Sequence, residues 1–307
     1  MNAAFPLLVI TGPTASGKTR RAVDVARALD AEIISGDSRQ VYRGMDLGTG
    51  KDLDEYGEVP YHLIDIAPAG YKYNLYEFLR DYDVAEARVR ASGRMPLLCG
   101  GTGLYVESVL NGIHLPEVPA NLELRAQLEG KTLEELTAIL AGMKNLHNTT
   151  DVDTAKRAIR AIEIETYYME HPEAASQASP EPRKDAVVVG VAIDRESRRL
   201  RISERLEARF RAGMTAEVER LLAAGIKPED LMYYGLEYKY VTQYVTGLIS
   251  AEEMHKGLET AIHRFAKRQM TWFRGMERRG HHVHWLPYDM APDDFVAEVK
   301  KLLFSHA

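Results

Sequence analysis

The chain has 307 residues, 45% hydrophobic and 27% charged, which is long enough to bury a sizeable core in one or two domains. Its formal net charge of −6 excludes a uniformly basic nucleic-acid-binding protein, so any polyanion site must be a local basic face. The single cysteine, Cys99, excludes an intrachain disulfide and a zinc site built from cysteines, and fits a reducing compartment. We expect no signal peptide and no membrane span.

The order of apolar runs and turns predicts the fold class. Five short apolar runs predict strands, at residues 7–10, 32–35, 62–66, 95–99 and 186–193. Helical patterns occupy residues 18–29 and the chain from about residue 195 almost to the end, apart from a strand-like run at 283–286. This alternation predicts an α/β fold, a P-loop NTPase-like parallel sheet flanked by helices.

The alternation is interrupted between the fourth and fifth predicted strands. Residues 132–135 have the spacing of a capping box, and residues 154–170 form a strong helical pattern. A run rich in Pro, Ser and Ala at 171–184 predicts a return loop. We therefore expect a helical insertion domain at 115–182, mounted on a core formed by 1–114 and 183–307. A second capping box at 250–253 opens a helix predicted to reach about Arg274.

The first predicted strand leads into a complete P-loop motif, and a predicted helix follows it. The glycines let successive backbone amides point into one hollow, and the helix adds its positive end. We expect a polyphosphate to bind there, with Lys18 as a point charge and the Thr19 hydroxyl on Mg²⁺. The motif alone does not specify a nucleotide. The binding residues are Gly12, Pro13, Thr14, Ala15, Ser16, Gly17, Lys18 and Thr19.

Polar residues follow other predicted strands at the same edge of the sheet, where ligands of open α/β folds bind. Asp37 can accept a proton from an attacking hydroxyl or amine, or can instead cap a helix or form an ion pair. Thr102, in the glycine-rich run 100–103, can hydrogen-bond a phosphate or a base, or belong to a tight turn. Asp65 and Asp194 both follow apolar strands, so the second metal ligand stays open.

Positive charge is segregated in three segments. Residues 195–211 and 256–279 are rich in arginine and lysine, and Lys156, Arg157 and Arg160 lie within one helical turn. Such segregation is typical of contacts to a phosphate backbone, although a single run can also be a solvated helix face. Nearby aromatic side chains can stack on unpaired bases or pack in the core: Trp272, Phe273, Tyr233, Tyr234, Tyr238 and Tyr240.

Taken together, these segments resemble the tRNA dimethylallyltransferase (isopentenyltransferase) family along nearly the whole chain. The P-loop is shared by many families, but the ordered set of motifs is far more specific. The motifs are GPTASGKT at 12–19, DSRQVY at 37–42, GTGK at 48–51, HLID at 62–65, GGTGLY at 100–105, RAIRAIE at 157–163 and AKRQMTWFR at 266–274.

The resemblance implies transfer of a dimethylallyl group from dimethylallyl diphosphate to the N6 amine of the adenosine 3′ of the anticodon in tRNA, with Mg²⁺ as cofactor. It implies four catalytic residues: Asp37 as general base, Thr102 at the target nucleotide, and Lys18 and Arg205 at the diphosphate. It also implies a cytoplasmic protein that works as a monomer.

The same resemblance implies that the insertion clamps the tRNA anticodon stem-loop. The implied tRNA-binding residues are Asp37, Ser38, Arg39, Gln40, Thr102, Arg125, Lys156, Arg157, Arg160, Tyr238, Lys239, Lys267, Arg268 and Gln269.

The chain departs from the family's usual pattern at three places. Asp153-Thr154 stands where the family has Asn-Asp, Glu237-Tyr238-Lys239 where it has Gly-Tyr-Lys/Arg, and GTGKD at 48–52 where it has GTAKP. Three other functions stay open from the sequence: a P-loop kinase of a small metabolite or nucleotide, an enzyme that prenylates free adenine nucleotides, and a non-catalytic RNA-binding protein switched by a nucleotide.

Overall fold

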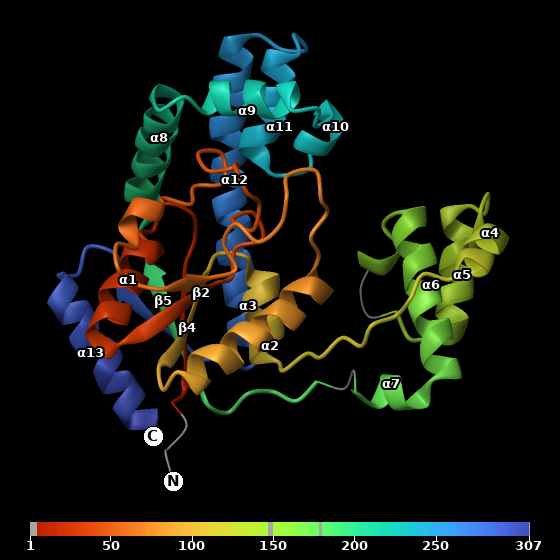
Figure 1. Cartoon of the computed structure of the whole chain (residues 1–307), viewed down its shortest axis with the longest axis horizontal. Coiled ribbons are helices and arrows are strands. Elements are labelled where there is room, and N and C mark those ends of the chain that lie inside the picture. The colour runs from red at the N-terminus through yellow and green to blue at the C-terminus, as the bar shows by residue number, and fades with distance from the viewer. Residues whose placement is uncertain (1–4, 147–149, 178–179, 307) are drawn as a thin grey trace. The chain divides into compact units, whose positions relative to one another are not determined.

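The computed structural model describes residues 5–146, 150–177 and 180–306, and the chain divides into two compact units (Figure 1). A core unit comprises residues up to Asn111 and from Arg183 onwards, and an insertion unit comprises Gly112–Pro182. In the described residues no helix is long and apolar enough to cross a membrane.

The core unit is built on a parallel sheet of six strands in the order β3-β2-β4-β1-β5-β6. Thr11 pairs with Gly100 on one side and Gly190 on the other, so β1 and β4 end level with one another and β5 continues to Ala192. The predicted α/β class with a parallel sheet is confirmed. The strands are β1 Leu7–Thr11, β2 Ala31–Ser35, β3 Tyr61–His62, β4 Met95–Gly100, β5 Ala186–Ala192 and β6 Val283–Pro287.

Helices cover both faces of the sheet (Figure 1). Helices α1 and α13 share one apolar core with alternate residues of the strands, among them Ala22, Phe295 and Ile10. Helices α2, α3 and α12 lie on the other face. The helices of the core unit are α1 Lys18–Leu29, α2 Leu75–Ala91, α3 Gly103–Leu110, α8 Arg195–Arg211, α9 Met214–Ala223, α10 Pro228–Leu231, α11 Leu236–Val245, α12 Ala251–Arg278 and α13 Pro292–His306, with a short 3₁₀ turn at Leu53–Glu55.

The insertion unit is helical and has a core of its own, formed by Leu128, Leu136, Leu140, Ala158 and Ile162 with their neighbours. The predicted capping box is present, because the Thr132 and Glu135 side chains each bond the other's backbone amide. Its helices are α4 Leu122–Leu128, α5 Leu133–Met143, α6 Ala155–Glu170 and α7 Pro172–Gln177, with a 3₁₀ turn at Thr150–Val152.

The structure differs from three of the predicted segments. The third strand, expected at 62–66, ends at His62, because Leu63 and Asp65 adopt left-handed backbone angles (φ 62° and 56°) that no strand accommodates. The return loop expected at 171–184 contains the helix α7. The helix expected to reach about Arg274 continues for another turn, to Arg278.

The turn after β3 is held by a buried lysine. The Lys51 side chain is 1% exposed, and its Nζ lies 2.6 Å from both the Tyr42 carbonyl oxygen and Asp46 Oδ1. The ammonium also donates to the Asp65 carboxylate. A buried cation is tolerated only when such partners satisfy it, so Lys51 fixes the segment from Tyr42 to Asp65.

We predict that Lys51→Met lowers the free energy of unfolding by about 2–3 kcal/mol, because it leaves two carboxylates and a carbonyl without their donor. Urea denaturation measures this change. Lys301→Met, at an exposed position of α13, is the control and is expected to change stability by less than about 0.5 kcal/mol. Equal stability of the two variants would contradict a structural role for Lys51.

Candidate active site

The phosphate-binding motif forms the turn between β1 and α1. Gly12, Ala15 and Gly17 have positive φ values of 157°, 63° and 83°, which curl the backbone into a loop. A Cβ on Gly12 would lie 2.9 Å from Ser16 Oγ and 3.2 Å from the Val191 carbonyl oxygen, so a larger residue does not fit there. Gly17 caps α1 without a side-chain bond, which leaves the first amides of that helix for an anion.

Two arginines of α8 contact this loop. Arg201 Nε donates to the Ala15 carbonyl oxygen at 2.9 Å, and Arg205 donates to the Thr14 hydroxyl. Burial lowers the pKa of Lys18; Asp37 opposes the shift, whereas Arg205 adds to it. Burial and then the charge of Arg209 lower the pKa of Arg205 to about 10. The loop is therefore surrounded by cations that an anion would stabilise.

A glutamine of α12 joins the phosphate loop to the turn after β4. Gln269 Oε1 accepts the Thr14 amide at 2.8 Å, and its Nε2 donates to the Gly101 carbonyl oxygen at 2.9 Å. The side chain is buried. Gln269 was expected to contact tRNA, but in the structure both ends of its amide hold the walls of the site.

Thr102 follows β4, the strand next to β1, and Asp37 follows β2, the strand beyond β4. Asp37 Oδ1 accepts the Arg39 amide at 2.9 Å. Thr102 Oγ1 accepts the Ser38 amide at 3.1 Å and lies 3.3 Å from Ser38 Oγ. Both side chains are partly exposed.

Most of the side chains that bind in this region line one cleft of about 630 Å³, whereas Arg201 lines an adjoining hollow. The cleft brings together most predicted site residues of the core unit and adds aromatic side chains at Tyr233, Phe265 and Trp272. Its predicted lining residues are Thr14, Lys18, Thr19, Asp37, Ser38, Arg39, Gln40, Thr102, Arg205, Lys239, Arg268 and Gln269. An adjoining hollow of about 410 Å³ exposes Thr19 beside Asp52 and Glu55.

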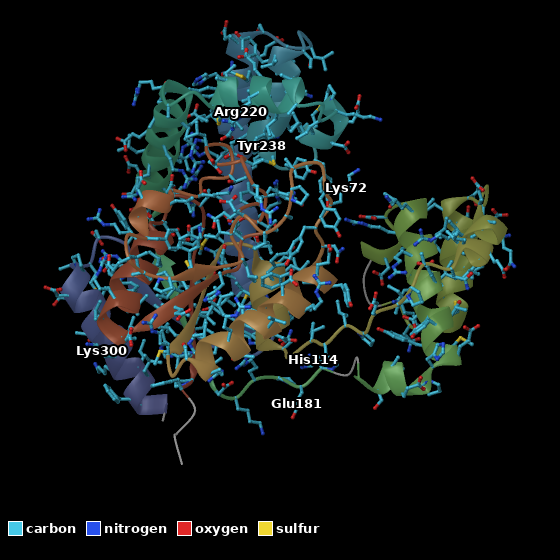
Figure 2. The ribbon with its side chains drawn as sticks, in the orientation of Figure 1. Lys72, His114, Glu181, Arg220, Tyr238 and Lys300 are labelled. Carbon is cyan, nitrogen blue, oxygen red and sulfur yellow. The ribbon has the colours of Figure 1, made fainter. Side chains whose placement is uncertain are left out.

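Several expected residues have other roles in the structure. Tyr238, expected at the RNA surface, is fully buried, and its hydroxyl donates to Glu217 Oε1 at 2.6 Å (Figure 2). Gln40 is buried too, and donates to the Gly50 carbonyl oxygen. Asp65 and Asp194, the two candidates for the second metal ligand, do not line the cleft. Instead, Asp65 binds Lys51 and Asp194 caps α8.

Sequence reasoning missed Glu217, which lies on α9 and has no motif around it. Its carboxylate accepts the amides of Asp46, Leu47 and Gly48 at 2.9–3.1 Å, in addition to the Tyr238 hydroxyl. This buried carboxylate holds the segment 46–48, which leads into a wall of the cleft. The wall itself, residues 48–50 and Asp52, lies far from α9 in the sequence.

In the insertion unit, a buried carboxylate gathers the predicted arginines. Glu163 accepts both Nε and Nη2 of Arg125 at 2.9 Å, and it also binds Arg160. Burial opposes ionisation, but hydrogen bonds from the two arginines and a backbone amide lower the pKa of Glu163 to about 2. Arg157 pairs with Asp153, and Lys156 is exposed.

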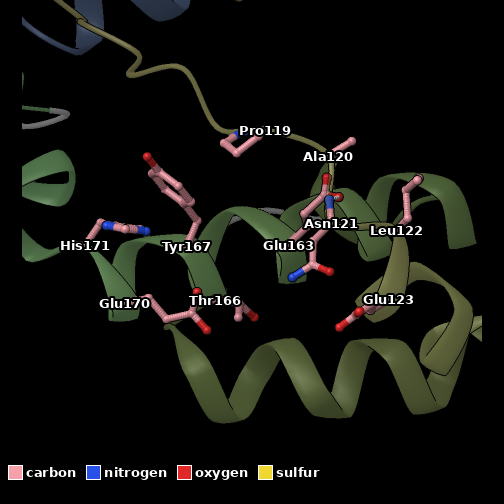
Figure 3. A pocket seen from close by; sticks show the side chains of 10 residues that line it. All are labelled: Pro119, Ala120, Asn121, Leu122, Glu123, Glu163, Thr166, Tyr167, Glu170 and His171. Carbon is pink, nitrogen blue, oxygen red and sulfur yellow. Dashed lines mark hydrogen bonds between the residues drawn. The ribbon is translucent and has the colours of Figure 1, made fainter.

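Beside these arginines lies a hollow of about 460 Å³ with an acidic lining that includes Glu123, Glu163 and Glu170 (Figure 3). Carboxylates repel a phosphate backbone, so this hollow itself is unsuited to RNA. Any RNA contact of the unit must use its outward-facing cations.

The parallel sheet, the curled loop at the end of β1 and the cations around it define a P-loop protein. The comparisons with known proteins agree and are more specific. The IPP transferase family model matches residues 40–276, and the isopentenyl transferase model matches residues 5–58. The chain belongs to the tRNA dimethylallyltransferase (IPP transferase) family.

Similar proteins span nearly the full chain. It is 57% identical over 303 residues to tRNA dimethylallyltransferase 2 of Bacteroides fragilis, covering 97% of this chain and 98% of that protein. It is 53% identical over 304 residues to tRNA dimethylallyltransferase 1 of Parabacteroides distasonis, covering 98% of each. The crystal structure of the tRNA isopentenylpyrophosphate transferase of Bacillus halodurans aligns with a TM-score of 0.71 at 30% identity, covering 98% of this chain and 97% of that one.

A eukaryotic dimethylallyltransferase, solved in crystallographic snapshots acting on tRNA, aligns with a TM-score of 0.81 over 97% of this chain and 78% of that one. At 19% identity this likeness supports the fold.

We predict that Gln269→Met lowers the free energy of unfolding by about 1–3 kcal/mol and weakens inorganic pyrophosphate binding, because the Thr14 amide and the Gly101 carbonyl lose their shared partner. Urea unfolding and calorimetric titration measure the two effects. Lys267→Met, exposed on the same helix, is expected to leave both values nearly unchanged. Unaltered pyrophosphate affinity in Gln269→Met would show that the hydrogen bonds of Gln269 to Thr14 and Gly101 do not determine the conformation of the phosphate-binding loop.

Proposed function

We propose that this chain transfers a dimethylallyl group from dimethylallyl diphosphate to the exocyclic N6 amine of the adenosine 3′ of the anticodon in tRNA. The family membership supports this reaction. The observation that carries it is one cleft that joins the phosphate-binding loop after β1 to the Thr102 hydroxyl after β4 and the Asp37 carboxylate after β2. A donor diphosphate and an acceptor base can thus meet without leaving the protein.

At the donor end, the bond between the allylic carbon and the diphosphate oxygen breaks, and negative charge accumulates on the departing diphosphate. The amides of residues 12–19, Lys18 and Arg205 are placed to stabilise this charge. Since Arg205 donates to Thr14 and Arg201 to Ala15, both guanidinium groups are already oriented towards the loop. Preorganised groups of this kind need no rearrangement as the charge develops.

Mg²⁺ fits the oxygen donors of this end. The Thr19 hydroxyl shares the adjoining hollow with the carboxylates of Asp52 and Glu55. Burial raises the pKa of Glu55, and the nearby charge of Asp52 raises it further. In the described residues no group of three or more His, Cys, Asp or Glu can hold a metal by itself, so Thr19 would bind Mg²⁺ together with diphosphate oxygens. When bound, the ion would supply further charge stabilisation.

At the acceptor end, the adenine amine attacks the allylic carbon, a carbon–nitrogen bond forms, and Asp37 takes the amine proton. Thr102 accepts the Ser38 amide and lines the same cleft, which supports a contact of its hydroxyl with the target nucleotide. The aromatic side chains of the cleft keep water away from the allylic cation and offer stacking surfaces to an extruded base.

The insertion unit is proposed to bind the anticodon stem-loop through its outward-facing cations. Lys156 is exposed at the start of α6 and available to phosphates, and Arg157, exposed beside it, is paired with Asp153. One chain holds the whole donor and acceptor machinery, so we propose that a cytoplasmic monomer suffices.

The direct test is incubation with radiolabelled dimethylallyl diphosphate, Mg²⁺ and bulk tRNA. Label is expected in tRNA, and nucleoside analysis should find it on N6 of adenosine. Replacing tRNA by AMP is expected to abolish incorporation. No label in tRNA, with turnover of ATP on a small acceptor instead, would establish a kinase and refute the proposal.

We predict that Asp37→Asn lowers kcat of prenyl transfer by about 10²- to 10⁴-fold, because the amine proton loses its acceptor while the shape of the side chain is kept. Single-turnover assays measure the rate, and calorimetry is expected to show nearly normal pyrophosphate binding. A variant with the wild-type rate would remove Asp37 from the mechanism.

We predict that Lys156→Glu raises KM for tRNA several-fold with little change in kcat, and reduces the salt dependence of tRNA binding by about one unit of slope. Filter binding at several salt concentrations measures the slope. Lys131→Glu, on the loop before α5, is a matched charge reversal in the same unit. Equal effects of the two variants would indicate a general charge effect without a specific contact.

A further inference from the structure

Helix α8 carries a third arginine towards the cleft, and neither the P-loop motif nor the proposed mechanism uses it. Arg201, Arg205 and Arg209 are spaced by four residues, which places them on one side of the helix. The first two contact the phosphate loop. Arg209 is 8% exposed and lines the cleft beside Arg205.

The guanidinium of Arg209 lies between two carboxylates without being closely bound by either. Its Nη2 is 3.7 Å from Asp52 Oδ2, and its Nη1 is 3.7 Å from Glu237 Oε1. Both separations exceed the length of an N–H···O hydrogen bond. The carboxylates therefore offset the charge of Arg209 and leave its N–H groups available for an anion.

The backbone is adapted to this guanidinium. A Cβ on Gly50 would lie 1.8 Å from Arg209 Nη2, so any larger residue would displace the arginine. Gly50 and Asp52 belong to one segment and Glu237 to α11, so two distant parts of the chain meet at this side chain.

The charge of Arg209 acts on the groups that face the donor diphosphate. Burial is the main cause of the lowered pKa of both Lys18 and Arg205, and Arg209 lowers both further. A diphosphate bound among the three cations would remove this mutual repulsion.

We propose that Arg209 binds the diphosphate of the prenyl donor alongside Arg205, and that Asp52 and Glu237 hold its guanidinium in place until the diphosphate arrives. The proposal rests on the proposed function for the identity of the donor. A guanidinium presents paired donors that match two phosphate oxygens, and charge-assisted bonds of this type are stronger than neutral ones. Arg209 is then a substrate-binding residue tied to this chain's particular set of neighbours.

The first test is calorimetric titration of the full chain with inorganic pyrophosphate and Mg²⁺. Arg209→Gln is expected to weaken pyrophosphate binding by about tenfold or more, as loss of a charge-assisted contact does. KM for dimethylallyl diphosphate should rise in parallel, whereas KM for tRNA should stay within about twofold. Arg211→Gln removes the same charge from an exposed position of the same helix and is the control. Wild-type pyrophosphate affinity in Arg209→Gln would overturn the proposal.

The second test removes one of the two carboxylates. Glu237→Gln is expected to tighten pyrophosphate binding by about two- to fivefold, because a negative charge next to Arg209 is lost. The gain should vanish in the Arg209→Gln background. If Arg209 served packing alone, Glu237→Gln would lower the melting temperature and leave pyrophosphate affinity unchanged, and that result would refute the contact.

Should Arg209→Gln fail to fold, Arg209→Lys keeps the charge and removes the planar pair of donors. It is expected to weaken pyrophosphate binding about threefold, and unchanged affinity would exclude a two-oxygen contact. Pyrophosphate titration needs neither tRNA nor chemistry. Failure of this proposal would leave prenyl transfer by the wild type intact, while failure of the proposed function would abolish transfer and leave the titrations interpretable.

Discussion

Positive charge that has no close anionic partner is concentrated at the carboxyl edge of the sheet, and the site depends on it. Arg201 and Arg205 donate to a carbonyl and a hydroxyl of the phosphate loop, which are neutral acceptors, and Lys18 faces the same space. Arg201 is exposed, but Lys18 and Arg205 are partly withdrawn from water, which raises the free energy of the folded chain unless an anion joins them. The fold tolerates the arrangement because curled backbone amides, a helix N-terminus and these side chains all favour one ligand, a polyphosphate.

One wall of the cleft is held in the opposite way, by buried charges that are fully satisfied. Glu217 accepts three successive amides and a tyrosine hydroxyl, and Lys51 donates to a carbonyl and two carboxylates. Apart from Tyr238, their partners lie in the segment 42–65, which carries this wall. The cations around the phosphate loop are thus left electrostatically incomplete for a ligand, whereas the charges behind the wall are satisfied by the protein and keep it rigid without one.

Local sequence signals predicted the parts of the site that depend on neighbouring residues. The P-loop between β1 and α1 and the alternation of strands and helices follow from short-range periodicity and glycine placement, and a parallel sheet then brings Asp37 and Thr102 to the edge that holds Lys18. Pairings over long distances in the sequence leave no such signal. Three such contacts depend on the packing of α8, α9, α11 and α12. They are the burial of Tyr238 against Glu217, the amide of Gln269 between two loops, and the position of Arg209 against Gly50. The third strand was misjudged because the apolar residues Leu63 and Ile64 are buried in a turn.

The two kinds of positive surface on this acidic chain suit two kinds of anion. In the core unit, Lys18, Arg205 and Arg209 are recessed in a cleft, where low exposure strengthens their interaction with a small, highly charged group and salt screens it weakly. In the insertion unit, Arg125 and Arg160 are paired with the buried Glu163 and Arg157 with Asp153, so the exposed Lys156 provides outward charge. Such cations bind an extended phosphate backbone through contacts that salt weakens and that carry little shape information. A diphosphate that must stay in register with an attacking amine needs the rigid, recessed set, and an RNA that must enter and leave needs the exposed one.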